Sequence, residues 1–246
     1  MVHRYEHPYP DAATAAQYPF DTLGFTRHDP ASMHTRAESF HDEMSQRRSV
    51  RMLSNEAVPR SLIELAVATA STAPSGAHQQ PWSFVATADP NVKQRIRAAA
   101  EAEERANYGI DGADGRMNER WQSEVAPLGT DWHKEFLDVA PWIVVLFEQR
   151  YGVRADGSKR HHYYVKESCG IAAGLFIAAL HHMGLATLTH TPSPMAFLTR
   201  ELDRPDNERP FVLFPIGFPT PDCKVPSLRR KSLAEVLTVV GADPSD

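Results

Sequence analysis

Cysteine is scarce in this chain: its 246 residues include only Cys169 and Cys223, and these lie far apart. A disulfide framework and a CxxC metal or redox pair are therefore excluded. Two free thiols are typical of a reducing compartment, so we expect a cytoplasmic protein. An apolar run of about 18 residues is also missing, and the N-terminal segment lacks the apolar block of a signal peptide, so we expect no membrane partner.

Excess positive charge is missing as well. The net charge of −5 gives the chain no general attraction to nucleic acid or anionic lipid, so we expect no nucleic-acid partner. HExxH, P-loop and GxSxG motifs are absent. The adjacent pairs His161-His162 and His181-His182 make poor chelates, because neighbours on a helix point about 100° apart. We expect no metal site, and any anion site must be a local cluster of Arg and Lys.

Helical and extended patterns alternate through most of the chain. Prolines punctuate residues 1–30, which predicts an irregular N-terminal arm, and we expect residues 31–246 to form a single domain. The patterns predict helices over 31–46, 59–70, 90–108, 130–138, 161–183 and 195–202, and strands over 82–87, 142–147, 185–189 and 211–216. This alternation indicates an α+β class with an arrangement close to a three-layer α/β/α sandwich.

Individual residues indicate the ends and the burial of some elements more specifically than the periodicity does. Asp89 followed by Pro90 is typical of a helix start, and Gly184 is typical of a helix end. The run WIVVLF over 142–147 predicts a strand that is buried on both faces. The string GIDGADG over 109–115 resembles a phosphate loop only superficially, because its spacing is not GxGxxG and its aspartates repel phosphate, so we expect a flexible turn.

Two basic clusters stand out in this acidic chain. Arg47, Arg48, Ser49 and Arg51 lie within five residues, and Arg229-Arg230-Lys231 lies near the other end. Guanidinium groups suit phosphate, because their N–H groups match its oxygens in pairs. A solvated basic turn is the alternative for either cluster taken alone, but two distant clusters together favour one shared anion.

Several strings occur in a familiar order: RRSVR, TAPSGAHQQPW, ANY, WHKEFLDVAPWIVVLF, GLATLTHTP and VPSLRRKSL. With these strings the chain resembles the nitroreductase-like flavoproteins, and most closely their iodotyrosine deiodinase branch, from about residue 46 to residue 240. RRSVR marks the broad superfamily, whereas TAPSGAHxxPW and WxKEFLDxAP are more specific to the branch. The resemblance implies a nitroreductase-like sandwich with a central mixed sheet, in an intertwined homodimer with exchanged terminal arms.

The resemblance also implies FMN bound at the dimer interface. By position, three groups of residues match the family's cofactor contacts. The first group matches the contacts to the phosphate and ribityl chain, and it consists of Arg47, Arg48, Ser49, Arg51 and Arg230. The second group matches the loop that lines the flavin ring from the other subunit, and it consists of Pro74, Ser75 and Gly76. The third group matches the threonines near the pyrimidine edge and N5 of the ring, and it consists of Thr189 and Thr191. Thr191 would favour single-electron steps over hydride transfer.

A second set of residues matches the family's substrate contacts. The resemblance directs the Ala77 amide at the phenolate oxygen of the substrate, a preorganised electrostatic contact. His78 as a general base is the alternative at that loop. Glu104, Lys134 and Tyr108 match the groups that hold the ammonium and carboxylate of an amino acid, within a lid over residues 104–134. Taken alone, Glu104 lies on what looks like a solvated helix face, and the string over 109–115 lengthens the segment between Tyr108 and Lys134.

These matches imply FMN-dependent reductive dehalogenation of halogenated tyrosines, with Thr191 and Ala77 as the catalytic contacts. The expected reductant is NAD(P)H, acting directly or through a reductase. A general nitroreductase or quinone reductase that uses NAD(P)H is the first alternative, and a nitroaromatic would not need Lys134. Flavin fragmentation toward the lower ligand of vitamin B12, and flavin binding without catalysis, are further alternatives.

The shared-anion hypothesis can be tested on the two basic clusters. We expect the double variant Arg48→Ala/Arg230→Ala to purify without yellow flavin, because it removes a phosphate contact from each cluster. The visible absorbance spectrum and the FMN released on denaturation measure occupancy, with the unaltered chain purified in parallel. Normal FMN occupancy in the double variant refutes the assignment.

Overall fold

The computed structural model describes residues 9–110, 112 and 115–241, and it divides the chain into two compact units, 1–43 and 44–246. Part of the turn predicted over 109–115, namely 111 and 113–114, lies outside the described residues. The predicted division between an arm over 1–30 and a domain over 31–246 stays a prediction. Among the described residues, none of the helices is both long enough and apolar enough to span a membrane.

The first unit contains a helix in the segment that we predicted to be irregular. Helix α1 (Ala12–Gln17) begins after Asp11, whose carboxylate accepts a hydrogen bond of 2.7 Å from the Thr14 N–H. An aspartate N-cap of this kind stabilises even a short helix. The next helix, α2 (Pro30–Gln46), begins one residue before the predicted range and runs into the second unit.

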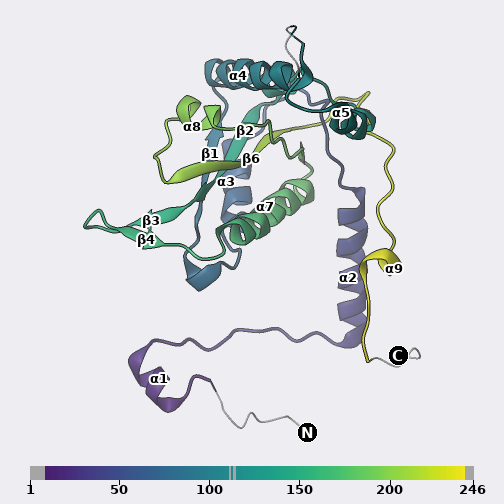
Figure 1. Ribbon diagram of the computed structural model, residues 1–246. Coiled ribbons are helices and arrows are strands. Elements are labelled where there is room, and N and C mark those ends of the chain that lie inside the picture. The colour runs from purple at the N-terminus through teal and green to yellow at the C-terminus, as the bar shows by residue number, and fades with distance from the viewer. Residues whose placement is uncertain (1–8, 111, 113–114, 242–246) are drawn as a thin grey trace. The chain divides into compact units, whose positions relative to one another are not determined.

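The second unit holds the remaining elements (Figure 1). Its helices are α3 (Arg60–Ala70), α4 (Pro90–Tyr108), α5 (Glu119–Val125), α6 (Phe136–Val139), α7 (Val165–His182), α8 (Phe197–Glu201) and α9 (Leu233–Val236). Its strands are β1 (Trp82–Thr87), β2 (Trp142–Gln149), β3 (Tyr151–Val153), β4 (Lys159–His161), β5 (Ala186–Thr187) and β6 (Glu208–Gly217).

The main sheet has the order β1-β2-β6-β5, and its neighbouring strands all pair antiparallel. The pairing sets Val144 opposite Phe214, with a register shift between Leu146 and Phe147. A parallel bridge joins Ser49 to Thr187 at the β5 edge, so the sheet is mixed, as predicted. This bridge brings the first basic cluster of the sequence to the sheet edge.

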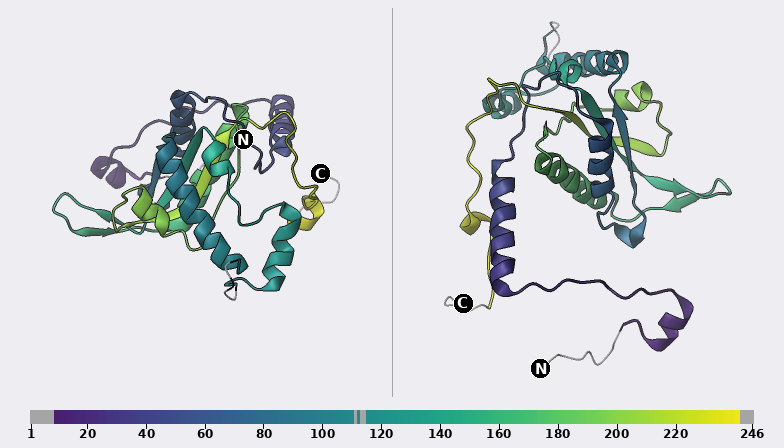
Figure 2. Two further views of the ribbon diagram at one scale, coloured as in Figure 1. Left: turned by 90° about the horizontal axis from the view of Figure 1, so that it is seen from above. Right: turned by 180° about the vertical axis from the view of Figure 1, so that it is seen from behind.

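Both faces of the sheet are covered by helices, which gives three layers (Figures 1 and 2). Successive residues of a strand point to opposite faces, so Val144 and Leu146 pack toward α3 and α7, whereas Ile143 and Val145 pack toward α4, α6 and α8. On the first face Phe176 packs between Phe84 and Phe214, with ring centroids 5.4 and 5.1 Å away. Burial on both sides explains why β2 is a continuous apolar run.

Helix α4 is the element that positions much of the site. Its start is as predicted: the Asp89 carboxylate accepts the N–H groups of Asn91 and Val92 at 2.8 and 3.3 Å, and Pro90 occupies the first turn. Its end is Gly109, at a positive φ of 69° that glycine adopts at little cost. On the inner side, Ile96 and Ala100 pack against the sheet and fix the helix on it.

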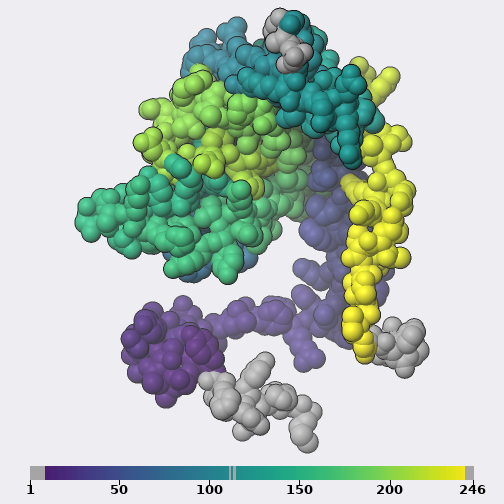
Figure 3. All heavy atoms as spheres, in the orientation of Figure 1, coloured from purple at the N-terminus to yellow at the C-terminus, as the bar shows by residue number. Residues whose placement is uncertain are grey.

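The structure differs from the predicted elements in several places. The helix predicted over 130–138 is restricted to α6, Phe136–Val139, because residues 130–134 are held by side-chain contacts instead of helical hydrogen bonds. Helix α7 begins at Val165, four residues later than predicted, because His161 belongs to strand β4 and residues 162–164 are neither helix nor strand. The projecting β3–β4 hairpin (Figures 1 and 3) and α5 were not predicted, since each carries too few residues for a clear period.

Candidate functional site

The two basic clusters of the sequence meet at one cavity of about 480 Å³. The described residues that line it include Ser45, Arg47, Arg48, Ser49, Arg51, Leu128, Thr189, Pro226, Leu228, Arg229 and Arg230. Five of these are arginines and none is acidic. The lining brings together two segments that are separated by almost the whole second unit.

Hydrogen bonds between the two segments hold the cavity together. The Arg230 guanidinium donates to the carbonyl oxygens of Ser45 and Arg47 at 2.7 and 2.6 Å. Arg48 donates in return to the carbonyl oxygen of Pro226. The last turn of α2 is thereby tied to the C-terminal segment, while Arg229 forms a two-point ion pair with Glu235, at 2.9 and 3.0 Å.

The electrostatics of this cavity favour an anion. Burial lowers the pKa of Arg47, and the positive charges of Arg230 and Arg48 lower it further. Burial also lowers the pKa of Arg51, whose Nε is buried and has no hydrogen-bond partner among the described residues. Like charges that crowd together without a carboxylate in the lining cost free energy, and a phosphate would offset that cost with charge-assisted hydrogen bonds.

Thr189 and Thr191 project from one face of the extended segment that follows β5. Both are exposed, and Leu188, His190 and Pro192 between and beside them are buried. The backbone of His190 is fixed to β6, since its N–H donates to the Leu213 oxygen at 2.8 Å and its oxygen accepts from the Leu213 N–H at 3.0 Å. Thr189 lines the arginine cavity, so this segment forms a wall beside it.

His190 is a buried residue that we did not select from the sequence. Its side chain lies against Phe136, with ring centroids 5.5 Å apart, and its Nε2 has no partner among the described residues. Burial, together with the positive charges of Lys134 and Arg51, lowers its pKa to about 3. His190 therefore experiences the charge of an arginine of the cavity as well as that of Lys134. The sequence held one hint, because His190 interrupts a run of threonines.

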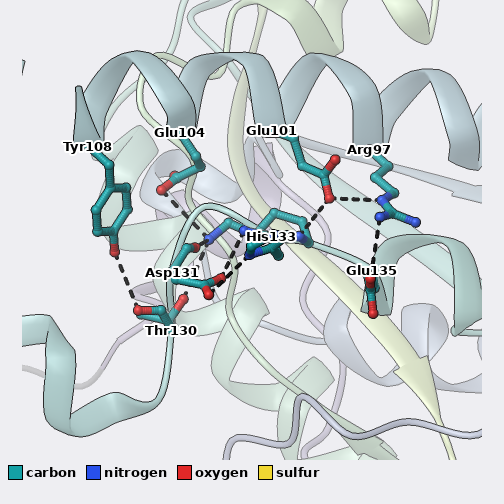
Figure 4. Close-up of polar contacts among 9 residues, drawn as sticks. Arg97, Glu101, Glu104, Tyr108, Thr130, Asp131, His133 and Glu135 are labelled. Atoms are coloured by element: carbon teal, nitrogen blue, oxygen red, sulfur yellow. Dashed lines mark hydrogen bonds and ion pairs between the residues drawn. The ribbon is translucent and has the colours of Figure 1, made fainter. Parts of the chain in front are cut away.

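Glu104 and Tyr108 lie in the C-terminal half of α4 and point toward the segment over 130–135 (Figure 4), and Lys134 of that segment pairs with Glu104. Lys134 and Glu104 are only 2% and 7% exposed, and Lys134 Nζ lies 3.6 Å from Glu104 Oε2. Lys134 Nζ also donates to the Asp131 carbonyl oxygen and to Thr130 Oγ1. The Tyr108 hydroxyl donates to the Thr130 oxygen at 3.4 Å. We call Glu104, Tyr108 and Lys134 the clamp.

Burial disfavours the charged forms of the clamp side chains. Burial raises the pKa of Glu104, although Lys134 counteracts this shift, and burial lowers the pKa of Lys134, although Glu104 and Asp131 counteract it. Burial and the charges of Glu104 and Asp131 raise the pKa of Tyr108. A buried cation and a buried anion that face each other can accept a ligand with one charge of each sign. The sequence alone could not distinguish this pair from a solvated helix face.

The loop over 74–80 has an unusual backbone. Ala77, His78 and Gln80 have positive φ values of 49°, 50° and 46°, which non-glycine residues seldom adopt. Gly76 is required by close approach, since a Cβ at this position would lie 2.5 Å from the Tyr163 carbonyl oxygen. A side chain at position 76 is therefore excluded by the Tyr163 backbone.

Side-chain contacts hold this loop in place. The Gln79 amide donates to the His161 oxygen at 2.9 Å and accepts from the Tyr163 N–H at 3.0 Å. Ser75 Oγ accepts from the Gln80 N–H at 2.9 Å. These bonds fix the backbone of Ala77, which lies in the short 3-10 turn Gly76–His78. His78 contacts Gln80 through its Nε2 and is exposed.

Within one chain, the loop over 74–80 and the arginine cavity lie at different ends of α7. The Gly76 N–H contacts Ser168 Oγ in the first turn of that helix, at 3.4 Å. Arg47 and Thr189 instead line a second cavity, of about 320 Å³, with Ile177 and Ala178 from its C-terminal half. An α-helix of 18 residues is about 27 Å long. One copy of the chain thus separates two groups of predicted site residues.

Comparisons with known proteins identify the family of the chain. Residues 44–218 match the family model described as the Nitroreductase family. The chain is 50% identical over 211 residues to the iodotyrosine deiodinase of Haliscomenobacter hydrossis. This match covers 86% of this chain and 93% of that protein. It is 44% identical over 211 residues to the iodotyrosine deiodinase of Danio rerio, and this match covers 85% of this chain and 70% of that protein.

Solved structures extend the comparison to the fold. A crystal structure of oxidized iodotyrosine deiodinase bound to FMN and 3-iodo-L-tyrosine matches 81% of this chain and 100% of that chain, with 26% identity and a TM-score of 0.66. A nitroreductase with bound FMN from Bacteroides fragilis matches 82% of this chain and 98% of that chain, with 18% identity and a TM-score of 0.57. The nitroreductase-like fold predicted from the sequence is confirmed.

The clamp geometry predicts strong coupling between its two charges. Lys134→Met should lower the free energy of unfolding by about 3–5 kcal/mol, because it leaves a buried carboxylate without its cation. Glu104→Gln/Lys134→Met should lose less than the sum of the two single variants. Urea denaturation of the four chains measures the coupling, and strict additivity would show that the two charges do not interact.

The same variants carry a pH prediction. Burial raises the pKa of Glu104 in the folded protein, and Lys134→Met removes the cation that counteracts this rise, so the raised pKa should rise further. A group with a raised folded-state pKa stabilises the fold below its unfolded pKa and loses that contribution as the pH rises through the folded pKa. The deficit of Lys134→Met should therefore shrink as the pH is lowered.

Proposed function

Because the chain belongs to the Nitroreductase family and, within it, to the iodotyrosine deiodinase branch, we propose that it removes halide reductively from halogenated tyrosine with the help of FMN. In this reaction the carbon–iodine bond breaks, iodide leaves with the electron pair, and a carbon–hydrogen bond forms. Two electrons and one proton enter, and the products are tyrosine and iodide. The paired charges of the buried clamp are the observation that carries the proposal.

The arginine cavity fits the phosphate and ribityl chain of FMN. Arg47, Arg48, Arg51 and Arg230 supply guanidinium groups, and Ser49 supplies a hydroxyl. The support is the unpartnered Nε of Arg51 and the mutual repulsion around Arg47, both of which a phosphate relieves. Bound FMN supplies the electrons for cleavage of the carbon–halogen bond. The exposed hydroxyls of Thr189 and Thr191 would then lie at the flavin ring, with Thr191 near its N5.

The clamp fits the amino acid end of the substrate. Glu104 would pair with the ammonium, Lys134 with the carboxylate, and the Tyr108 hydroxyl would donate to the same end of the ligand. A zwitterion replaces one buried ion pair by two, so neither charge of the clamp is left alone. A halophenol without the amino acid group leaves the Glu104–Lys134 pair as it is and gains nothing from it.

The loop over 74–77 would act on the phenol end. An Ala77 N–H aimed at the phenolate oxygen stabilises the ionised ring and needs no reorganisation during the reaction, since the backbone is already fixed by Gln79 and Ser75. We give this role to a backbone amide because the loop is already hydrogen-bonded, and not to His78, which is exposed. Pro74, Ser75 and Gly76 add a surface without bulk for the flavin ring.

The two ends of the site meet only if a second copy contributes one of them. We therefore propose a homodimer in which the loop of one chain faces the arginine cavity of the other. Large apolar side chains are exposed in both terminal segments, and these would be covered by a partner. They are Tyr18, Phe20, Leu23, Phe25, Met33 and Phe40 in the first segment, and Leu233, Val236, Leu237, Val239 and Val240 in the last.

A reduced nicotinamide, NAD(P)H, is the proposed source of electrons, directly or through a reductase. The two cysteines are both free thiols, and Cys169 is buried, which fits a protein of the cytoplasm.

The reaction can be tested directly under anaerobic conditions. We expect the reduced, FMN-loaded protein to convert 3-iodo-L-tyrosine into tyrosine and iodide in equal amounts, which chromatography measures. Lys134→Gln should lose at least about tenfold in kcat/KM, because a charge-assisted hydrogen bond to the carboxylate is worth roughly 1.5–3 kcal/mol.

A nitroaromatic substrate provides the matched control, because it has no zwitterion for Lys134 to hold. Any turnover of it should be the same in the unaltered protein and in Lys134→Gln. Absence of tyrosine and iodide, together with brisk turnover of the nitroaromatic, would instead favour a general nitroreductase.

Shared sites predict complementation between two inactive chains. Arg48→Ala/Arg230→Ala removes two guanidinium groups from the arginine cavity. Gly76→Val distorts the loop, because its added Cβ meets the Tyr163 oxygen. Coexpressed with different tags and purified through both, the mixed dimer should recover about half of the unaltered activity, since one of its two sites is intact. A mixed dimer as inactive as its parents would mean that each site lies within one chain.

A further inference from the structure

One face of α4 carries two of the clamp residues together with two further charged residues. Arg97, Glu101, Glu104 and Tyr108 follow one another at spacings of four, three and four residues, which puts all four on one side of the helix. Figure 4 shows Glu101, Glu104 and Tyr108 directed from the helix toward the segment over 130–135. Glu104 and Tyr108 belong to the clamp, whereas the proposed function gives Arg97 and Glu101 no part.

Glu101 binds the backbone of the clamp lysine. The Lys134 N–H donates to Glu101 Oε1 at 2.8 Å, across 33 positions of sequence. The same carboxylate accepts from Arg97 Nε at 2.8 Å. Arg97 is itself fixed, because it also donates to Asp138 Oδ2 at 2.7 Å and lies 3.8 Å from Glu135. The Lys134 N–H therefore ends on a carboxylate that cannot move freely.

The segment that carries Lys134 needs such an anchor. Residues 130–134 lie outside the described helices and strands, so regular backbone hydrogen bonds do not hold them. The lysine side chain is flexible, and its Nζ must stay near Glu104 to meet the carboxylate of a ligand. An error of about 1 Å in the position of a binding group can cost on the order of 100-fold in rate.

We propose that Glu101, held by Arg97, is a positioning residue that fixes the backbone of Lys134 on α4 and so sets the distance between the two charges of the clamp. The proposal rests on the proposed function for its ligand. In this proposal Glu101 acts through Lys134 and not on the ligand itself, since its Oε1 accepts both the Lys134 N–H and Arg97 Nε. Specificity for an amino acid zwitterion then depends on a residue one helical turn before the clamp.

Ligand binding tests the proposal in the FMN-loaded, oxidised protein. Glu101→Ala should weaken binding of 3-iodo-L-tyrosine by at least about tenfold and leave binding of 2-iodophenol unchanged, because the phenol has no charges for the clamp. Glu101→Gln should keep most of the affinity, since its amide oxygen still accepts the Lys134 N–H. Quenching of flavin fluorescence measures both dissociation constants. Parallel loss of affinity for both ligands, with loss of FMN, would mean a merely structural role and overturn the proposal.

Glu201→Ala is the matched control. It removes another carboxylate that pairs with an arginine of α4, Arg95, at 3.0 Å, but it does not reach Lys134. We expect this variant to bind both ligands like the unaltered protein. A tenfold loss for 3-iodo-L-tyrosine in Glu201→Ala as well would show that any weakening of α4 is sufficient and would overturn the specific role of Glu101.

Hydrogen exchange tests the anchor without any substrate. In the FMN-loaded protein, Glu101→Ala should speed exchange of the Lys134 amide, whereas Glu101→Gln and Glu201→Ala should leave it slow. This measurement separates the two proposals: if the unaltered protein does not act on iodotyrosine, the proposed function fails, and the exchange rates still decide whether Glu101 fixes Lys134. An unchanged rate in Glu101→Ala refutes the anchor.

Discussion

The pairing of β2 with β6 is the constraint on which the site depends. Both strands are buried on both faces, so helices must cover each side, and α4 is fixed on one of them through Ile96 and Ala100. The same β6 strand holds the segment after β5, through the two backbone bonds between His190 and Leu213. The helix that carries Glu104 and Tyr108 and the segment that carries Thr189 and Thr191 are thus positioned by one rigid sheet.

Much of this fold was predictable from local signals. The strand over 82–87 was predicted with its observed bounds, and the cap at Asp89 and the stop at Gly184 are present in the structure. Elements without a long period were missed, as in α1 and the β3–β4 hairpin. The segment over 130–134 looked helical, but its tertiary contacts override that local preference.

The charged groups of the candidate site were predictable from the sequence, but the residues that hold them in place were not. The two basic clusters and the clamp residues could be selected from their chemistry and their resemblance, and the structure brings each group together. Nothing in the sequence indicated that Glu101 would accept the Lys134 N–H, because that contact joins residues far apart along the chain. The burial of His190 was hidden for the same reason: it depends on packing against Phe136 and on pairing with Leu213.

Histidine is the side chain that proteins most often use to sense protons near neutrality. His190 has lost that ability, since burial and the positive charges of Lys134 and Arg51 lower its pKa to about 3. Mild acidification of the medium therefore adds no third positive charge beside Arg51 and Lys134. Because the ring stays neutral near neutral pH, it does not add to the repulsion from Arg51 that already lowers the pKa of Lys134.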